Sequence, residues 1–430
     1  MLNFNPLSPL SEQAVACLLG AACGDALGSI QEGTPKRLVQ PISDLQGGGL
    51  LGVQAGEWGD DTAMTLCLAD SLLACHGFHS RDQMDRYLRW WQQGYRSCTG
   101  QPPRVGKTVL AALTRYQHTH DPWSGDEDPL TAGNGALMRV APIALYYYGE
   151  RQSVERAMQI AAWQAMLTHG EERAVQACQL VTWLLWQLLD GEQDKEHWLD
   201  PRRLLSLLKP WGAHWHPDIV DVISGSYRHK DAQHIRATGY VIHTLEAALW
   251  ALWQCDDFAS GALLAANLGE EAGTTASVYG QLAGPLYGLS SLPAHWRSQL
   301  HQAAAIQQTA LALIGANPCE PSGEERQRIA KQWAERLAYR GPVSTLHQFT
   351  SACHRHQLVV FFDWGQWQRD PLQLSLAEVK ELSELAARKV LSALLRIEQS
   401  NEGTLLKAWE SGLLRGLLLQ LAAAPIPPVA

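Results

Sequence analysis

The chain has 430 residues, enough for two or three domains of ordinary size or for one large helical domain with an appendage. Hydrophobic residues make up 46% of it and charged residues 18%, a balance that excludes a mainly disordered chain. The 34 Lys and Arg are outnumbered by 43 Asp and Glu, so the net charge is −9 and we expect no non-specific binding to nucleic acid.

The first 23 residues predict a helix rather than a secretory signal, because no Lys or Arg precedes the apolar residues 14–23 and Glu12 does. No apolar run reaches about 18 residues, since glutamines interrupt residues 174–189, so we expect no membrane partner. The nine cysteines include no C-x-x-C pair, which indicates neither a disulfide framework nor a zinc knuckle. We therefore expect a soluble protein of the reducing cytoplasm.

Apolar residues recur at helical spacing through most of the chain, and strand patterns are almost absent. Residues 180–189 are apolar nearly all round, which suits a helix buried within a bundle. The sequence therefore predicts an all-α protein of layered helices. The predicted helices lie in residues 15–28, 63–76, 84–93, 154–167, 172–189, 238–254, 275–287 and 296–315.

The helical pattern is interrupted at residues 317–323, where prolines and a glycine are concentrated. We predict a helical domain over residues 10–316 and a small, mainly helical domain over residues 324–424. The predicted elements of the second domain are a short strand or buried turn at residues 358–362 and helices at residues 376–399 and 404–424.

Two carboxylates stand side by side, as Asp60 and Asp61, where a predicted helix begins after a glycine-bearing turn. One aspartate at this place is explained as a helix cap, because the helix dipole favours negative charge there. Paired carboxylates next to the Thr62 hydroxyl also suit a hard divalent cation such as Mg²⁺ or Mn²⁺. Capping and metal binding both remain open interpretations of this turn.

A second acidic turn, residues 267–275, precedes a helix with small residues at Gly280, Ala283 and Gly284. Small residues let neighbouring helices approach closely. If this helix and the helix that follows Asp61 start side by side, the two acidic turns converge on one point. Capping by Thr274 or Glu271 is the alternative interpretation.

A glycine turn at residues 133–139 precedes another predicted helix, and its backbone amides are a candidate anion cradle. His169 ends a predicted helix, a position where a lone histidine is more often structural than functional. His118 and His120 have no metal-ligand partner at a convincing spacing.

Taken in chain order, these motifs resemble the ADP-ribosylglycohydrolase family, which includes the hydrolases that restore ADP-ribosylated dinitrogenase reductase. The similarity covers about residues 15–288. The matching segments are residues 24–32 (G-D-A-L-G and a following Glu), 60–62 (the T-D-D-T turn), 134–139 (N-G-S-L-M-R), 168–170 (T-H-G) and 267–284 (the N-L-G-D-D-A-D-T helix start).

The resemblance implies an orthogonal multi-helix bundle with a centre of one or two Mg²⁺ ions, or Mn²⁺, that hydrolyses the C1″ bond between ADP-ribose and an acceptor, often arginine. It implies Glu32, Asp60 and Asp61 as catalytic residues, with Glu32 as the candidate base. The implied metal ligands are Asp60, Asp61, Glu271 and Thr274. The implied substrate contacts are Asn134, Gly135, Ala136, Met138 and His169.

The sequence departs from the family pattern at the metal turns, where Gly59 replaces a threonine and Gly273 replaces the second aspartate of D-x-D-T. Arg104 and Ala136 replace an aspartate and a serine elsewhere. We therefore expect weaker metal binding, and two functions remain open: a working hydrolase, or a member that binds ADP-ribose without efficient turnover. The C-terminal domain, with residues 363–365 and 409–412, resembles a small bacterial domain of unknown function.

Overall fold

The computed structural model describes residues 7–101, 105–150, 152–208, 215–315, 323–338, 345–346, 349–350, 353, 358, 370–400 and 403–423. The described residues form two compact units, one drawn from residues 1–74 and 80–317 and the other from residues 75–79 and 318–430. Apart from three isolated bridges, helices and turns make up the described part of both units, so the predicted all-α class is confirmed.

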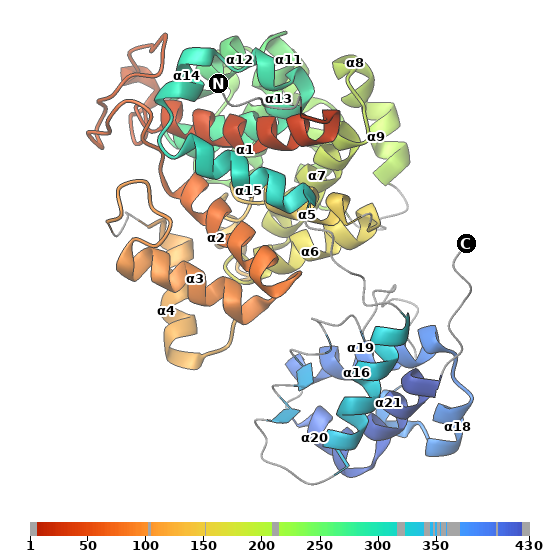
Figure 1. Ribbon diagram of the computed structural model, residues 1–430. Coiled ribbons are helices and arrows are strands. Elements are labelled where there is room, and N and C mark those ends of the chain that lie inside the picture. The colour runs from red at the N-terminus through yellow and green to blue at the C-terminus, as the bar shows by residue number, and fades with distance from the viewer. Residues whose placement is uncertain are drawn as a thin grey trace. The chain divides into compact units, whose positions relative to one another are not determined.

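The helices of the first unit run from red to teal in Figure 1. They are α1 (Pro9–Gly28), α2 (Asp60–Cys75), α3 (Ser80–Gln93), α4 (Lys107–Thr119), α5 (Ala141–Gly149), α6 (Val154–Met166), α7 (Glu172–Leu189), α8 (Lys195–Trp198), α9 (Pro201–Leu208), α10 (Pro217–Ile223), α11 (Val241–Gln254), α12 (Phe258–Ala266), α13 (Ala272–Tyr287), α14 (Ala294–Gln299) and α15 (Ala303–Gly315).

Apolar periodicity predicted one helix of this unit with its correct bounds and merged two others into one. Helix α7 has the predicted bounds, and it packs in the core against α5, α6, α11 and α13. The single helix predicted over residues 296–315 is wrong, because the chain forms α14 and α15 with a turn between them. Gln302 in that turn has a positive φ of 56°, which a continuous helix cannot contain.

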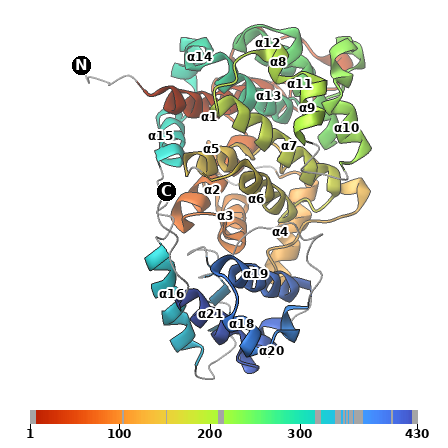
Figure 2. The same cartoon turned by 90° about the vertical axis from the view of Figure 1, so that its right-hand side faces the viewer.

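Helices α1 and α13 lie side by side in antiparallel contact at the centre of the first unit (Figures 1 and 2). A Cβ atom on Gly24 would lie 2.0 Å from the Ala276 carbonyl oxygen, and one on Gly28 would lie 2.2 Å from that of Ala272. The two backbones are therefore too close for side chains at these glycines. This contact brings the C-terminal end of α1 next to the N-terminal end of α13.

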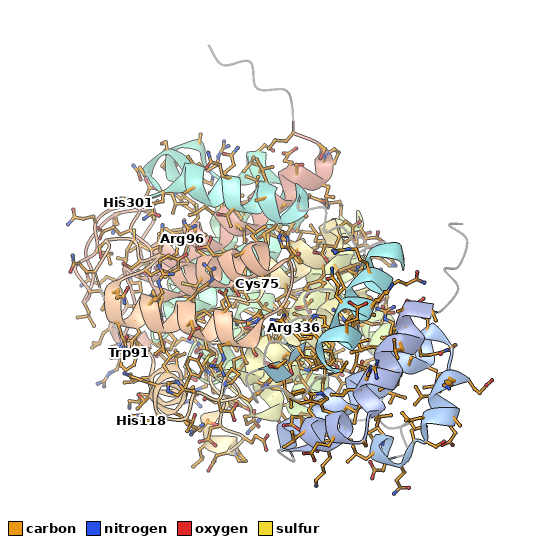
Figure 3. The ribbon with its side chains drawn as sticks, turned by 60° about the horizontal axis from the view of Figure 1, so that its bottom comes forward. Cys75, Trp91, Arg96, His118, His301 and Arg336 are labelled. Carbon is orange, nitrogen blue, oxygen red and sulfur yellow. The ribbon has the colours of Figure 1, made fainter. Side chains whose placement is uncertain are left out.

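Surface side chains tie α2 to the segment that follows α3. Arg96, labelled in Figure 3, forms an ion pair with Asp70 of α2, with Nε and Oδ2 2.6 Å apart. His118, also labelled, is exposed on α4, and its Nδ1 lies 2.7 Å from the Thr114 carbonyl oxygen.

Within the described ranges, no helix combines the length and the apolar character needed to cross a membrane. The eight cysteines of those ranges are free thiols.

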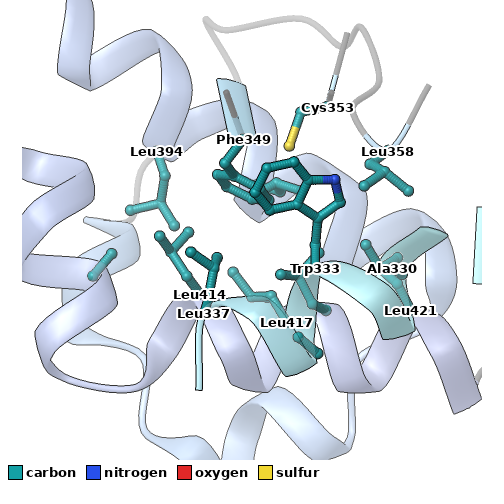
Figure 4. Close-up of a cluster of buried hydrophobic side chains, with 14 of the residues drawn as sticks. Ala330, Trp333, Leu337, Phe349, Cys353, Leu358, Leu394, Leu414, Leu417 and Leu421 are labelled. Carbon is teal, nitrogen blue, oxygen red and sulfur yellow. The ribbon is translucent and has the colours of Figure 1, made fainter. Parts of the chain in front are cut away.

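The second unit has its own hydrophobic core, in which the Trp333 and Phe349 ring centroids are 5.4 Å apart (Figure 4). Of the predicted strand or buried turn at residues 358–362, Leu358 is buried in this core, and the rest lies outside the described residues, as do residues 363–365. The described helices are α16 (Gly323–Arg336), α18 (Leu376–Lys380), α19 (Glu384–Ser400), α20 (Thr404–Glu410) and α21 (Leu413–Ala423).

Both helices predicted near the C-terminus are broken in the structure. Ser383 interrupts the first, because its hydroxyl accepts a hydrogen bond from the Ala386 amide and so starts α19. Gly412 interrupts the second with a positive φ of 79°, a backbone conformation that glycine adopts readily. Apolar periodicity continues across both breaks, so the pattern alone did not reveal them.

Candidate active site

Asp25, buried within α1, positions the start of α2. Its Oδ1 accepts a hydrogen bond from the Gly59 amide at 2.8 Å, and its Oδ2 accepts from the amide and the hydroxyl of Thr62 at 2.9 and 2.7 Å. Asp25 therefore satisfies first-turn donors that a cap would otherwise satisfy. Asp25 belongs to the G-D-A-L-G motif of residues 24–32, and its role was not predicted, although a carboxylate in a mostly apolar helix is a signal for one.

Helix α2 begins at Asp60 itself rather than at Ala63 as predicted. Because Asp25 binds the amides of this turn, capping does not account for both Asp60 and Asp61. Asp61 is buried, with its Oδ1 lacking any partner among the described residues. Asp60 is half-buried.

The two acidic turns meet beside Glu32, and the meeting depends on α1. Glu32 Oε2 accepts a hydrogen bond from the Gly273 amide at 2.8 Å, and the negative charge of Glu271 acts on the Glu32 carboxyl. The Thr274 side chain acts on Asp61 and opposes the rise in its pKa. Residues 32, 60, 61, 271 and 274 are thus brought together, as predicted, through the contact of α1 with α13 and the hydrogen bonds from Asp25 to α2.

Burial and neighbouring negative charges raise the pKa values of Glu32, Asp60 and Asp61. Burial, followed by the negative charge of Glu271, raises the pKa of Glu32 to about 9. Burial and the charge of Asp25 raise the pKa of Asp60 to about 7, and the same two causes hold the pKa of Asp61 well above its usual range. The cluster therefore favours bound protons, or a bound cation, over a set of free negative charges.

The glycines that replace family residues lie directly against this cluster. A Cβ atom on Gly273 would be 3.1 Å from Glu32 Oε2 and 3.5 Å from Asp61 Oδ2. A Cβ atom on Gly59 would be 3.1 Å from Asp25 Oδ1. A side chain at either position would point at a carboxylate. The two glycines therefore leave the site without the side-chain oxygens that a threonine or an aspartate would supply there. Arg104 lies outside the described residues.

No group of three or more His, Cys, Asp or Glu side chains in the described part of the chain has its ligand atoms already arranged to hold a metal ion. Instead, Glu32 Oε2 accepts a hydrogen bond from the Gly273 amide, and the charges of neighbouring carboxylates act on Glu32 and Asp61. The donor set nevertheless fits a hard divalent cation, because the unpartnered Asp61 Oδ1 and the raised pKa values identify carboxylates that lack positive charge.

The glycine turn after residue 132 contains unpartnered donors. The amides of Gly135 and Ala136 are buried and donate to no described acceptor. The Asn134 amide donates to the Gly239 carbonyl at 3.1 Å, and its Nδ2 donates to Thr244 Oγ1 at 2.9 Å. Free amides at a glycine turn suit an anion. Met138 is almost fully buried, and its carbonyl accepts from Gln281.

Gly239 connects the glycine turn with the carboxylate cluster. Its carbonyl binds Asn134, and a Cβ atom on Gly239 would lie 3.9 Å from Glu271 Oε1. The Glu271 amide in turn donates to the Ala237 carbonyl at 2.8 Å. The anion cradle and the cluster are therefore neighbouring parts of one site.

His169 is buried against the glycine turn. A Cβ atom on Gly133 would lie 3.1 Å from its Nε2, and one on Gly135 would lie 3.0 Å from its Cε1. Burial, aided by the positive charge of Arg139, lowers the pKa of His169 to about 3, so the imidazole is neutral. The structure therefore brings His169 to the turn with which the sequence analysis grouped it.

The fold is that of a known class of enzymes. A family model described as ADP-ribosylglycohydrolase matches residues 6–321, and the chain belongs to the ADP-ribosylglycohydrolase family of glycosidases. The resemblance stated from the sequence is confirmed. Residues 318–425 match a second model, which describes a family of unknown function.

The chain is similar to bacterial hydrolases over most of its length. It is 37% identical to the ADP-ribosylarginine hydrolase Tri1 of Pseudomonas putida, covering 71% of this chain and 79% of the relative. It is 29% identical to the ADP-ribosyl-dinitrogen reductase glycohydrolase of Rhodospirillum rubrum, covering 67% and 90%. A solved structure titled "ADP-ribosylglycohydrolase-related protein complex" matches with a TM-score of 0.63 and 38% identity, covering 72% of this chain and 100% of that one.

Proposed function

We propose that this enzyme removes ADP-ribose from modified arginine side chains and that it requires Mg²⁺, for which Mn²⁺ can substitute. The observation that supports the metal requirement is the convergence of Glu32, Asp61 and Glu271, where burial and neighbouring negative charges raise the pKa values of Glu32 and Asp61. The choice of arginine is supported by the similarity to ADP-ribosylarginine hydrolases.

The residues that would hold the cation are Asp60, Asp61, Glu271 and Thr274. A bound Mg²⁺ polarises the ribose hydroxyls and favours the ionised form of the neighbouring carboxyls. Since Gly59 and Gly273 supply no side-chain oxygen, we propose one strongly bound ion, with water molecules completing its coordination.

The chain's own groups divide the remaining work between the two parts of the site. The amides of Gly135 and Ala136 bind the diphosphate, assisted by His169, while Asn134 and Met138 shape the turn that presents those amides. Glu32 accepts a proton at its carboxyl oxygen from the water whose oxygen forms the new bond to C1″, and this proton then passes to the departing guanidine nitrogen. The ionised aspartates stabilise the positive charge that develops on the ribose as the C1″–N bond breaks.

The test is the release of ADP-ribose from a protein modified on arginine, measured with Mg²⁺ and with a chelator, beside the same protein modified on serine. We expect release from the arginine-modified protein with Mg²⁺ only. The matched control is Asp61→Asn, which keeps the shape of the side chain and removes its charge. Binding of ADP-ribose by the wild type without any release would select the alternative, a binding protein without turnover.

A further inference from the structure

Arg139 is a buried cation that has no carboxylate partner among the described residues. Its side chain is 0% exposed, and its Cζ lies 4.5 Å from the centroid of the Tyr87 ring. Removing a guanidinium from water is costly unless its donors are satisfied. The hydrogen bonds of Arg139 are made to neutral acceptors: the Met64 sulfur, and oxygens of Gln164 and Thr168. The bonds to Gln164 and Thr168 lead to the anion cradle.

The first set of hydrogen bonds leads to the glycine turn. Arg139 Nε donates to Gln164 Oε1 at 3.0 Å, which fixes the orientation of that amide group. Gln164 Nε2 then donates to the Ala136 carbonyl at 3.1 Å. Because a peptide group is planar, a fixed carbonyl also fixes the peptide unit that follows Ala136 and limits the rotation of the turn.

The second set leads to His169. Arg139 Nη2 donates to Thr168 Oγ1 at 2.8 Å, and Thr168 Oγ1 lies 2.8 Å from His169 Nδ1. A guanidinium has no acceptor, so the Thr168 hydroxyl cannot donate to Arg139. Arg139 Nη2 and His169 Nδ1 are the partners of Thr168 Oγ1 among the described residues, so the hydroxyl donates its hydrogen to His169 Nδ1. The neutral imidazole must then carry its hydrogen on Nε2.

The Nε2–H group is left unpartnered where an anion would bind. Nε2 makes no hydrogen bond within the described residues, although His169 is 1% exposed. It lies beside Gly133 and Gly135, next to the unpartnered amides of Gly135 and Ala136. The opposite tautomer would present a lone pair at this place, which would repel an anion.

We propose that Arg139 is a positioning residue which, through Thr168, sets His169 as an Nε2–H donor and, through Gln164, holds the glycine turn, so that three neutral donors face an anionic group of the substrate. The identity of that group as the diphosphate of ADP-ribose rests on the proposed function. The hydrogen-bond relay itself does not.

The relay is tested by nitrogen-15 NMR of histidine-labelled, ligand-free enzyme, with the His169 signal identified by its loss in His169→Gln. We expect the wild type and Thr168→Ser to carry the imidazole hydrogen on Nε2. Thr168→Val keeps the shape of threonine without the hydroxyl, and we expect a mixture of tautomers. A wild-type imidazole with its hydrogen on Nδ1 would overturn the relay, whether or not the enzyme is active.

The binding consequence is tested with ADP-ribose as the calorimetric probe. We expect Thr168→Val to weaken binding about tenfold or more, the effect of losing one well-placed hydrogen bond to a charged group, and Thr168→Ser to stay within about threefold. In turnover, the loss should appear in KM rather than in kcat. Equal affinity of Thr168→Val and the wild type for ADP-ribose would refute the positioning role. A wild type that does not bind ADP-ribose would refute the proposed function, and the NMR result alone would then test the relay.

Discussion

At the scale of single residues, Gly273 is the most informative departure from the family pattern. A side chain at this position would stand against both carboxylates, because its Cβ atom would lie 3.1 Å from Glu32 Oε2 and 3.5 Å from Asp61 Oδ2. We predict that Gly273→Asp raises the affinity for Mg²⁺ at least tenfold, since a carboxylate about 4 Å from a unit positive charge contributes about 4 kcal/mol at an effective dielectric constant of about 20.

The matched control for this substitution is Gly273→Ala, which adds a methyl group and no charge. Calorimetric titration with Mg²⁺ should show the gain in Gly273→Asp alone. Without cation, the new carboxylate joins an already crowded negative cluster, so this variant should also unfold at a lower temperature than Gly273→Ala. Equal Mg²⁺ affinity in the two variants would count against a cation at this place.

Asp61 offers a second prediction at this scale, in which stability and activity change in opposite directions. At pH 8 in a chelator, Asp61→Asn should unfold at a temperature equal to or above that of the wild type, because it removes a buried carboxyl whose ionisation is opposed by burial and by neighbouring negative charges. Hydrolysis with Mg²⁺ should fall about 100-fold or more. Differential scanning calorimetry and an ADP-ribose release assay measure the two effects, and a large loss of stability without cation would contradict the prediction.

At the scale of secondary structure, the contact between α1 and α13 decides whether the acidic turns meet. We predict that Gly24→Ala destabilises the first unit by about 1–3 kcal/mol or more, because its methyl group would overlap the Ala276 carbonyl and push the helices apart. The same displacement separates Glu32 from Gly273, so hydrolysis should fall as well.

Gly315→Ala is the control for this helix contact, since a Cβ atom on Gly315 would meet no atom within 4 Å. It makes the same chemical change at the end of α15 and should leave unfolding and hydrolysis near wild-type values. Urea unfolding followed by circular dichroism, together with the release assay, compares the two variants. Similar behaviour of both would show that the close approach of α1 and α13 is not required.

Helix boundaries were the least predictable feature at this scale. Periodicity located α7 to the residue, because nearly every turn of α7 is buried. It ran through the breaks at Gln302, Ser383 and Gly412, where a local backbone or side-chain hydrogen bond ends a helix while the apolar residues continue. Such breaks depend on single residues, and a pattern averaged over several turns does not reveal them.

At the scale of the whole molecule, the raised carboxyl pKa values predict how stability depends on pH. Asp60 and Glu32 have folded-state pKa values of about 7 and about 9, against about 4 in an unfolded chain. Between these limits the folded state binds more protons than the unfolded state, so the free energy of unfolding should fall as pH rises from about 4 to about 9. Saturating Mg²⁺ should reduce this fall.

Urea titrations in a chelator at pH 5, 7 and 9 measure that dependence. Glu32→Gln serves as the control, because its side chain does not titrate and the difference from the wild type isolates one carboxyl group. The wild type should lose more stability than Glu32→Gln between pH 7 and 9. Parallel curves would mean that the Glu32 pKa is not raised.

The second unit should unfold as a structure with its own core. Leu417 is fully buried in the cluster around Trp333, and Leu417→Ala should lower the stability of this unit by about 2–5 kcal/mol. We expect calorimetry to show the transition of this unit shifted downward while Mg²⁺ affinity is unchanged. A change in Mg²⁺ affinity would link this core to the carboxylate cluster.

The sequence by itself determined the helical class, the family and the identity of the acidic and glycine turns, because periodicity and short motifs are local properties of a chain. Tertiary structure alone decided that Asp25 holds α2, that Glu32 binds the amide of Gly273, and that Arg139 reaches both Thr168 and Gln164. These contacts join residues distant in the chain, and they form only where glycines let two backbones approach and buried polar groups must find partners.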